Sequence, residues 1–503
     1  MQRGQAAIQA RNASEAAQWF EKAVKKTPKD PQALASLGQS LCWLKRQKEG
    51  LEYLYKAGIQ LEKRARKSRD TQQLLLLAEQ LQHWEDYHYS LILIKQAIKI
   101  NNSGIRGQQL LACTYLRLNK TKQALTASQN ALKKAPDNII LNLLQASLET
   151  QAGLHDNAIV RLTKITSNNT ASSEELYRAH KELALILDKK GNYDEVFKHL
   201  YAAADIAPSI PEIKKQDAEF VPRVIQEYTK GFDQELLSRW SKDEFPESPQ
   251  APVFLIGFLR SGTTLTQEVL DTHPDVFVSD ETDLLVSTRE ELKRLKGGSD
   301  VTELLRNADK ETINHLRQYY WKNAINRYGD SISKQLFIDK TTMNTFDLGL
   351  INCIFPDAKI LFLLRDPRDV CLSCFMQVMT PSAMTVHLTS WKSLANLYHL
   401  TLTWWLHIKS LTTMDYLEFR YEDTISDFEG TYRNIFEFLE LEWTDEANNF
   451  HKHAAKKFIA SPSYTQVTKP LYSSSLARWK RFEKEFIPVI DKLQPFITEF
   501  NYD

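Results

Sequence analysis

The sequence has few cysteines, no long hydrophobic run and almost no net charge. Its five cysteines are odd in number and scattered, which excludes a disulfide framework and fits a reducing compartment. No stretch approaches the roughly 18 consecutive apolar residues of a membrane span, and the first residues contain no apolar signal-peptide core. The 64 basic and 63 acidic residues nearly cancel, so no overall charge attracts nucleic acid or an anionic membrane. These absences predict a cytoplasmic protein with no membrane span and no nucleic-acid partner.

Cys371 and Cys374 have the C-x-x-C spacing that occurs in zinc and redox sites. No second cysteine pair and no suitably spaced histidines accompany them, and a zinc site would need these further ligands. We therefore expect both cysteines to pack along a helix, and we predict no metal site.

Small residues recur along the first two hundred residues with a nearly constant spacing. One position of the pattern is occupied in turn by Ala23, Ala57, Ala97, Ala131, Ile165 and Ala203, and most spacings are 34 residues. This is the period of tetratricopeptide repeats, in which two helices approach closely and each repeat buries its apolar face against the next. We predict about six repeats over residues 1–210, forming an all-α superhelix that binds a peptide or a protein. The alternative is a set of unrelated amphipathic helices.

A chain of 503 residues is too long for one hydrophobic core, and its second half has a different pattern. The repeat is lost over residues 211–250, which end in a proline-rich stretch and are expected to form a helical linker. Beyond this segment, apolar runs alternate with stretches long enough for crossover helices. The best strand candidates are residues 253–258, 334–340, 359–366 and 416–423. The alternation predicts a three-layer α/β domain over residues 251–503 with a mainly parallel sheet.

The first of these strands leads into a loop that is typical of a phosphate site. The sequence VFLIGFLRSGTT, residues 253–264, has glycines five positions apart before a helical stretch. The backbone N–H groups of such a loop and the positive end of a helix dipole converge on an anion. An ATP-hydrolysing P-loop ends in Gly-Lys-Ser/Thr, whereas this chain has Gly262, Thr263 and Thr264, with its cation upstream at Arg260. The missing lysine disfavours ATP hydrolysis and predicts a different phosphate-rich ligand.

Residues 252–282, PVFLIGFLRSGTTLTQEVLDTHPDVFVSDET, resemble the 5′-phosphosulfate loop of sulfotransferases, which use 3′-phosphoadenosine 5′-phosphosulfate (PAPS). The likeness is greatest to protein-tyrosine sulfotransferases, because a His-Pro pair precedes an acidic-Glu-Thr turn and an arginine occupies position 260. The resemblance implies a P-loop-like domain whose loop holds the 5′ phosphate, with Arg260 nearest the transferred sulfuryl group. The loop residues are Arg260, Ser261, Gly262, Thr263 and Thr264.

The same resemblance assigns catalytic roles to the acidic turn and to a strand-ending lysine. Glu281 matches the general base of tyrosine sulfotransferases, although this chain has Asp280 where the family has a second glutamate. Asp280 and Asp283 are nearby substitutes, and the alternative for the turn is an exposed helix start. Lys340, which ends the strand FIDK, matches the lysine on the oxygen that bridges phosphate and sulfate. The alternative for Lys340 is a solvated charge.

Arg365 and Ser373 have the spacing of the family's 3′-phosphate motif. They stand eight residues apart in LLRDPRDVCLSCF. Arg365 leaves the predicted strand, Pro367 begins a helix, and Ser373 returns to the same side nearly two turns later. An arginine and a hydroxyl would then grip a phosphate that ATP lacks. The alternative for Arg365 is an ion pair with Asp366 or Asp369.

Weaker matches follow toward the carboxyl end. Tyr421 in FRYED corresponds to a tyrosine that packs near the adenine, and Ser463 and Arg478 correspond to a late serine and a basic residue that meet the cofactor. Gln466 and Lys469 belong to the same pattern, and lysine is usual where this chain has Arg478. The resemblance therefore implies further PAPS contacts from Tyr421, Ser463 and Arg478.

These features together predict a PAPS-dependent sulfotransferase joined to repeats, an arrangement known among bacterial proteins. The acceptor is a hydroxyl on a peptide tyrosine, another protein group, a glycan or a small molecule, and His387 is a candidate to face it. The repeats are expected to bind the acceptor or a partner protein. Two alternatives stay open. A P-loop nucleotide kinase is disfavoured by the missing lysine, and a scaffold with an inactive sulfotransferase-like domain is disfavoured because Arg260, Glu281, Lys340 and Arg365 are all present.

Overall fold

The computed structural model describes residues 1–503 except residues 11, 45, 102–103, 247, 456–466 and 472–473. The chain divides into two compact units, Met1–Ile186 and Leu187–Asp503. The division falls inside helix α11 (Ser173–Lys190), so the last turn of that helix belongs to the second unit. Among the described residues, no helix has the length and apolar character needed to cross a membrane.

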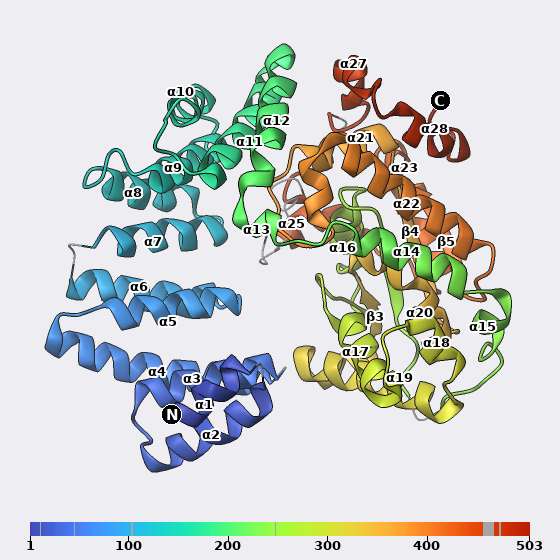
Figure 1. The fold of residues 1–503 in the computed structure, drawn as a ribbon, viewed down its shortest axis with the longest axis horizontal. Coiled ribbons are helices and arrows are strands. Elements are labelled where there is room, and N and C mark those ends of the chain that lie inside the picture. Colours follow the sequence, from blue (N-terminus) through green and yellow to red (C-terminus); the bar gives the residue numbers. More distant parts are fainter. Residues whose placement is uncertain (11, 45, 102–103, 247, 456–466, 472–473) are drawn as a thin grey trace. The chain divides into compact units, whose positions relative to one another are not determined.

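The first unit is a succession of helices, and from α1 to α10 each packs against the next along the chain (Figure 1). Besides the first part of α11, they are α1 (Gln2–Gln9), α2 (Ala13–Lys26), α3 (Pro31–Trp43), α4 (Gln47–Ser68), α5 (Gln72–His83), α6 (Tyr87–Ile100), α7 (Ile105–Arg117), α8 (Thr121–Leu132), α9 (Ile139–Gln151) and α10 (His155–Thr166). Polar side chains fix several helix starts: Asn12, Asp30, Asp86 and Asn138 each accept a backbone N–H of the first turn.

Small residues let neighbouring helices of this unit approach closely, as the repeat pattern predicts. Ala57 and Ala131 are completely buried. Gly38 of α3 and Gly50 of α4 face each other so closely that a Cβ on either would lie 2.7 or 2.6 Å from the other's carbonyl oxygen. The predicted all-α architecture of the first unit is therefore confirmed.

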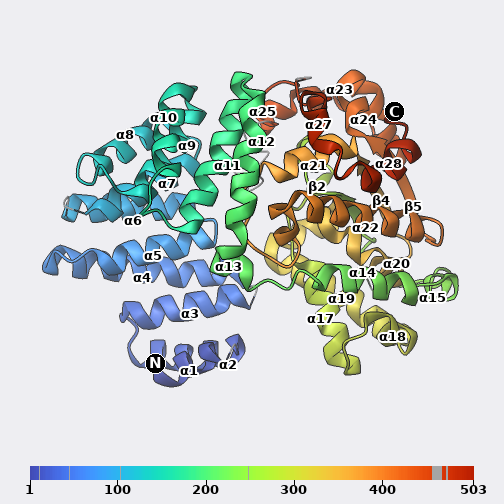
Figure 2. The same ribbon diagram turned by 45° about the horizontal axis from the view of Figure 1, so that its top comes forward.

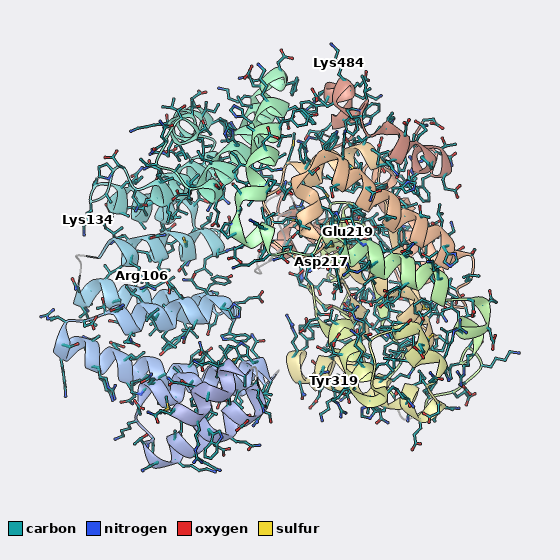
Figure 3. All side chains as sticks on the ribbon, in the orientation of Figure 1. Arg106, Lys134, Asp217, Glu219, Tyr319 and Lys484 are labelled. Carbon is teal, nitrogen blue, oxygen red and sulfur yellow. The ribbon has the colours of Figure 1, made fainter. Side chains whose placement is uncertain are left out.

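Charged contacts on the surface of the first unit add little to this packing. Arg106 of α7, labelled in Figure 3, donates to both carboxylate oxygens of Glu79 of α5, at 3.2 and 2.6 Å. Both side chains are well exposed, and exposed ion pairs contribute about 0–1 kcal/mol. Burial of the apolar and small side chains is therefore the main source of stability in the first unit.

The second unit is built around a five-stranded parallel sheet. Its strands are β1 (Val253–Gly257), β2 (Val276–Val278), β3 (Leu336–Asp339), β4 (Lys359–Leu364) and β5 (Asp415–Arg420), in the order β2-β3-β1-β4-β5. The four strands predicted from the sequence are confirmed with small changes at their ends. Sequence reasoning missed β2, because three residues between two turns are too few to show a strand pattern.

The other elements of the second unit are helices and short 3-10 turns. The helices are α12 (Tyr193–Ile206), α13 (Pro211–Lys214), α14 (Phe220–Gly231), α15 (Gln234–Ser238), α16 (Thr263–Leu270), α17 (Leu284–Lys296), α18 (Val301–Arg306), α19 (Lys310–Tyr328), α20 (Leu348–Ile354), α21 (Pro367–Phe375), α22 (Trp391–Lys409), α23 (Tyr421–Ser426), α24 (Phe428–Phe438), α25 (Phe450–Ala454), α27 (Glu483–Phe486) and α28 (Ile490–Glu499). The 3-10 turns are η1 (Ala207–Ser209), η2 (Asp330–Lys334), η3 (Thr342–Asp347), η4 (Thr385–Thr389), η5 (Asp445–Asn449) and η6 (Arg478–Phe482).

Helices cover both faces of the sheet, because successive strand side chains point to opposite sides (Figure 2). On one face, Leu255 of β1 belongs to a buried core that includes side chains of α16, α24 and α25. On the other face, Phe362 of β4 stacks on Trp405 of α22 with ring centroids 3.9 Å apart, and Phe254 of β1 contacts Tyr320 of α19. The predicted three-layer α/β architecture is therefore confirmed.

The described part of residues 211–250 packs within the second unit. Helix α14 lies against α22, and α15 lies against α20. Phe232 and Trp240 are almost completely buried, and the carbonyl of Leu237 accepts a hydrogen bond from the side chain of Asn352 at 2.8 Å. This segment, expected as a helical linker, is helical and contributes to the core of the α/β unit.

Candidate active site

The loop between β1 and α16 turns at two residues with left-handed backbone angles. Arg260 has φ 66°, and Gly262, with φ 119°, precedes the first residue of α16. The first N–H groups of a helix have no partner inside the helix, and the helix dipole makes this end positive. Thr345 of η3 supports the loop, because its Oγ1 accepts the N–H of Gly257 at 3.2 Å. The Oγ of Ser261 is buried without a hydrogen-bond partner among the described residues. The loop therefore offers several donors to an anion.

We expect Gly262→Ala to damage this loop. Glycine adopts φ 119° readily, and a Cβ at this position would lie 2.5 Å from Cδ2 of Tyr421. Backbone strain alone costs about 1–3 kcal/mol, and the clash adds to it, so thermal unfolding should begin at a lower temperature. Gly297→Ala is the matched control, because Gly297 also has positive φ but open space around it. Equal stability of the two variants would contradict the prediction.

Beside the loop lies a pocket, here called the loop pocket. It is lined by residues of the loop, of α16, of the segments that follow β4 and β5, and of the carboxyl-terminal segment. The described lining residues are Arg260, Gly262, Thr264, Leu265, Arg365, Ser373, Tyr421, Ile425, Phe450, Val467, Lys469, Pro470, Leu471, Ser475 and Arg478. They include four cations and no carboxylate, so the lining favours a ligand with several negative charges.

Arg365 lies at the centre of the contacts around the loop pocket. Its Nη1 donates to the carbonyl of Arg260 at 3.0 Å and its Nη2 to the carbonyl of Ser475 at 2.7 Å. Its guanidinium carbon lies 4.6 Å from the centre of the Tyr421 ring, and its Nε is buried without a partner among the described residues. Ser373 accepts a hydrogen bond from Nε of Arg260 at 3.1 Å. Both residues of the predicted 3′-phosphate motif therefore lie next to the loop.

Neither ion pair considered for Arg365 forms the main contact of its guanidinium. Asp366 binds the side chain of Arg368 through both carboxylate oxygens. Asp369 accepts the backbone N–H of Trp479 at 2.9 Å. Burial raises the pKa of Asp369, and the positive charge of Arg365 only partly offsets this effect.

Arg478 is held at the loop pocket by a carboxylate from the last turn of α11. Its Nη2 donates to Oδ2 of Asp188 at 2.7 Å. Arg481 lies 3.7 Å from Oδ1 of the same residue, and the Asp188 side chain is buried. A single buried carboxylate therefore orients two arginines. The partners stand 290 residues apart in the sequence, so no local pattern could reveal this contact.

The acidic turn after β2 and the end of β3 bring Glu281 to Lys340. Nζ of Lys340 donates to Oε1 of Glu281 at 2.7 Å and to Oδ1 of Asp280 at 3.2 Å. The Lys340 side chain is 1% exposed, whereas that of Glu281 is 46% exposed. Burial alone would lower the pKa of Lys340, but the two carboxylates outweigh it and raise the pKa above its usual value. Lys340 is therefore a buried cation at neutral pH, not a solvated strand-end charge.

Two threonine hydroxyls connect this pair to the loop. Oγ1 of Thr342 lies 3.5 Å from Oε1 of Glu281 and 3.0 Å from Oγ1 of Thr263, the first residue of α16. The Glu281–Lys340 pair is thus connected to the loop through Thr342 and Thr263. Sequence reasoning missed Thr342, although its place just after Lys340 was a usable signal. It also missed Ser475, which stands in a run of three serines that gives no reason to choose one.

The remaining site candidates from the sequence are Ser463, Gln466 and His387. Ser463 and Gln466 lie outside the described residues. His387, considered as a group facing the acceptor, is buried in η4, and its Nδ1 lies 2.7 Å from Oγ of Ser393. The structure therefore adds no support for a role of His387 in acceptor binding.

The cysteine pair lies inside α21. Cys371 and Cys374 are both buried free thiols. Burial raises the pKa of the Cys374 thiol to about 12, which disfavours the reactive thiolate at neutral pH. Within the part of the chain that the structure describes, no group of three or more potential ligands is placed to hold a metal ion.

Family comparisons identify both parts of the chain. Residues 252–445 match the model of the sulfotransferase family, and residues 1–60 and 110–162 match a tetratricopeptide repeat model. The second unit therefore contains a sulfotransferase-family domain, and the first contains tetratricopeptide repeats. The matched sulfotransferase segment includes the loop, Glu281, Lys340, Arg365 and Ser373.

Individual relatives match the chain at low identity. An uncharacterised protein of Aquifex aeolicus (strain VF5) is 24% identical over 445 residues, which are 83% of this chain and 56% of the relative. Protein-tyrosine sulfotransferase A of Caenorhabditis elegans is 24% identical over 262 residues, 50% of this chain and 67% of the relative. The sulfotransferase domain of the Synechococcus PCC 7002 olefin synthase is 21% identical and covers 48% of this chain and 90% of its own, with a TM-score of 0.34. The chain spans roughly half to two thirds of these curated relatives.

Proposed function

We propose that this protein is a sulfotransferase that moves a sulfuryl group from PAPS to an acceptor hydroxyl. One observation carries the proposal: the loop after β1 lies next to Arg365 and Ser373 and is connected through Thr342 to the carboxylate of Glu281. The loop pocket brings Arg365 and Ser373 next to the loop. Thr342 links the loop to Glu281. The sulfotransferase family match over residues 252–445 supports the same reaction class.

The described residues fit a sulfuryl donor with two phosphate positions. Two buried hydrogen-bond donors, Oγ of Ser261 and Nε of Arg365, have no partner among the described residues. Gly262 lets the Tyr421 ring pack against the loop backbone, since a Cβ at this position would lie 2.5 Å from Cδ2 of Tyr421. In this assignment the loop residues hold the 5′ phosphate, and Arg365 and Ser373 hold the 3′ phosphate. Tyr421 and the apolar lining of the loop pocket accommodate the adenine.

The reactive groups have complementary roles. PAPS, when bound, supplies a sulfuryl group activated by its bond to phosphate. Glu281 accepts the proton that the acceptor hydroxyl loses as its oxygen bonds to sulfur. Lys340 stabilises the negative charge that grows on the phosphate oxygen as the old sulfur–oxygen bond breaks, and Arg260 adds positive charge at the loop. Because the site supplies charges in fixed places, positioning accounts for much of the expected rate enhancement.

For the acceptor, we propose a hydroxyl on a peptide or protein, with a tyrosine as the first candidate. Protein-tyrosine sulfotransferases are among the relatives of the second unit. Repeats of the kind found in the first unit commonly bind peptides or partner proteins, so we propose that they bind the acceptor or a partner. A glycan or a small molecule is the alternative acceptor.

Calorimetric titration with four nucleotides tests the donor assignment. We expect 3′,5′-adenosine bisphosphate, the product form of the donor, to bind with a micromolar dissociation constant. 5′-AMP, ADP and ATP should bind more weakly, because they lack the 3′ phosphate. Preference for ATP would indicate a nucleotide kinase, and failure to bind any of the four would indicate a scaffold with an inactive domain.

A further inference from the structure

A completely buried carboxylate lies next to the Glu281–Lys340 pair, one residue before Lys340 in the chain. Asp339, the last residue of β3, is 0% exposed. Its Oδ1 accepts hydrogen bonds from the hydroxyls of Thr341 at 3.0 Å and Thr282 at 3.2 Å. Its Oδ2 accepts one from the hydroxyl of Tyr320 at 2.8 Å. Three hydroxyls from three separate segments of the chain therefore converge on one carboxylate.

This arrangement lowers the stability of the fold, and well-packed apolar side chains in its place would be more favourable. No ion pair to Asp339 occurs among the described residues, and burial of a carboxylate without a cation is unfavourable. Burial raises the pKa of Asp339, and the hydrogen bonds from Tyr320, Thr341 and Thr282 partly offset that rise. The pKa of Tyr320 is raised well above its usual value, first by burial and then by Asp339, so its hydroxyl keeps the proton that it donates.

Two of the three hydroxyl contacts fix the residues that directly follow Glu281 and Lys340. Thr282 follows Glu281, and Thr341 follows Lys340. The two threonines also bind each other, because Oγ1 of Thr341 accepts the backbone N–H of Thr282 at 2.8 Å. Hydrogen bonds of Asp339 and Thr341 to Thr282 thus connect the acidic turn to the end of β3.

The turn needs such support because Glu281 has an unfavourable backbone conformation. Its φ is 38°, in the left-handed region where a residue with a side chain is strained. Its backbone N–H donates to the carbonyl of Lys340 at 3.0 Å. With the turn held in this way, Oε1 of Glu281 lies 2.7 Å from Nζ of Lys340.

We propose that Asp339 and Thr341 are positioning residues, which hold the Glu281 carboxylate and the Lys340 ammonium in the geometry required for transfer. Neither residue needs to touch the donor or the acceptor. The expected effect on transfer rests on the proposed sulfotransferase activity. The positioning itself rests on the contacts of Thr282, Thr341 and Asp339. No part of it depends on which acceptor is used.

The matched pair Thr341→Val and Thr341→Ser tests the role of the hydroxyl. Valine has nearly the same shape but cannot accept the N–H of Thr282 or donate to Asp339, whereas serine keeps both functions. We expect kcat of Thr341→Val to fall about 10- to 100-fold, because small displacements of reacting groups have effects of this size. KM for PAPS should stay within about two-fold. Thr341→Ser should retain most of the activity, and thermal unfolding should show that both variants are folded.

A purely structural role would give a different result, in which kcat falls only as far as the folded fraction does or falls equally in both variants. Either outcome would overturn the inference. Asp339→Asn is the second test, because its amide cannot accept three hydroxyl groups, and it should reproduce the selective loss of kcat.

Crystal structures of the two Thr341 variants separate this inference from the proposed function. We expect the Glu281–Lys340 contact to be lost in Thr341→Val and kept in Thr341→Ser, whether or not the wild type transfers sulfuryl groups. An unchanged acidic turn in Thr341→Val would overturn the positioning role. Inactivity of the wild type with every acceptor, combined with the expected change in the turn, would overturn only the proposed function.

Discussion

Replacement of Lys340 by methionine is expected to lower kcat about 100- to 1,000-fold, the usual effect of removing one group that stabilises transition-state charge. Methionine has a similar length and suits a side-chain site that is only 1% exposed. It removes the cation that would meet the charge growing on the leaving phosphate. Binding of 3′,5′-adenosine bisphosphate should weaken much less, because the loop and Arg365 still hold its phosphates. Steady-state kinetics at saturating donor measures the effect.

Lys359→Met is the matched control for this experiment. Lys359 begins β4 and pairs in register with Val253, the first residue of β1, so it lies at the opposite end of the strands from the site. Its ammonium binds Glu440 and the carbonyl of Phe438. We expect kcat of this variant to stay within about two-fold of the wild type, since it makes no contact with the proposed reactive groups. A loss of kcat in Lys340→Met no larger than in Lys359→Met would contradict the assigned role.

Arg365→Ala is expected to weaken binding of 3′,5′-adenosine bisphosphate by about 1.5–3 kcal/mol, the range for a hydrogen bond to a charged group. This corresponds to about a 10- to 150-fold higher dissociation constant. The reason is that Arg365 lines the loop pocket and its Nε has no hydrogen-bond partner among the described residues. Binding of 5′-AMP should change much less, because this nucleotide has no 3′ phosphate.

The comparison between the two nucleotides is needed because Arg365 also supports the pocket. It donates to the carbonyls of Arg260 and Ser475, and loss of these contacts would loosen the walls for either ligand. A general loosening would weaken both nucleotides alike. Equal losses for the two nucleotides would therefore contradict a specific 3′-phosphate contact, and a larger loss for the bisphosphate would support it. Arg433→Ala, at an exposed helical ion pair with Glu429, controls for the change in net charge.

Much of the α/β architecture could be predicted from the sequence, because its signals are local. The buried strand, glycine-bearing loop and helix that surround Gly262 are contiguous in the chain. The eight-residue spacing of Arg365 and Ser373 also has a local reason, since a strand end and two turns of helix return to the same side. The helical repeats were visible because small residues recur at almost constant intervals.

The features that the sequence did not reveal depend on contacts between distant segments. Strand β2 has only three residues, and its pairing with β3 defines it rather than any pattern of its own. Asp339 reads as an ordinary residue before a lysine, because two of its three hydroxyl partners, Thr282 and Tyr320, come from other parts of the chain. The burial of Lys340 was equally hidden, since a lysine at a strand end is usually solvated. Only the tertiary structure brings these residues together.

Transfer of radioactive sulfur from labelled PAPS, compared between the wild type and Glu281→Gln, tests the central claim most directly. The acceptors should include tyrosine-containing peptides, a glycan and small hydroxyl compounds. We predict that the wild type labels at least one acceptor. Glu281→Gln should label it at least about 100-fold more slowly, because loss of a general base typically costs this much or more. Equal labelling by the two proteins would contradict the role of Glu281, and no labelling of any acceptor by the wild type would contradict sulfuryl transfer itself.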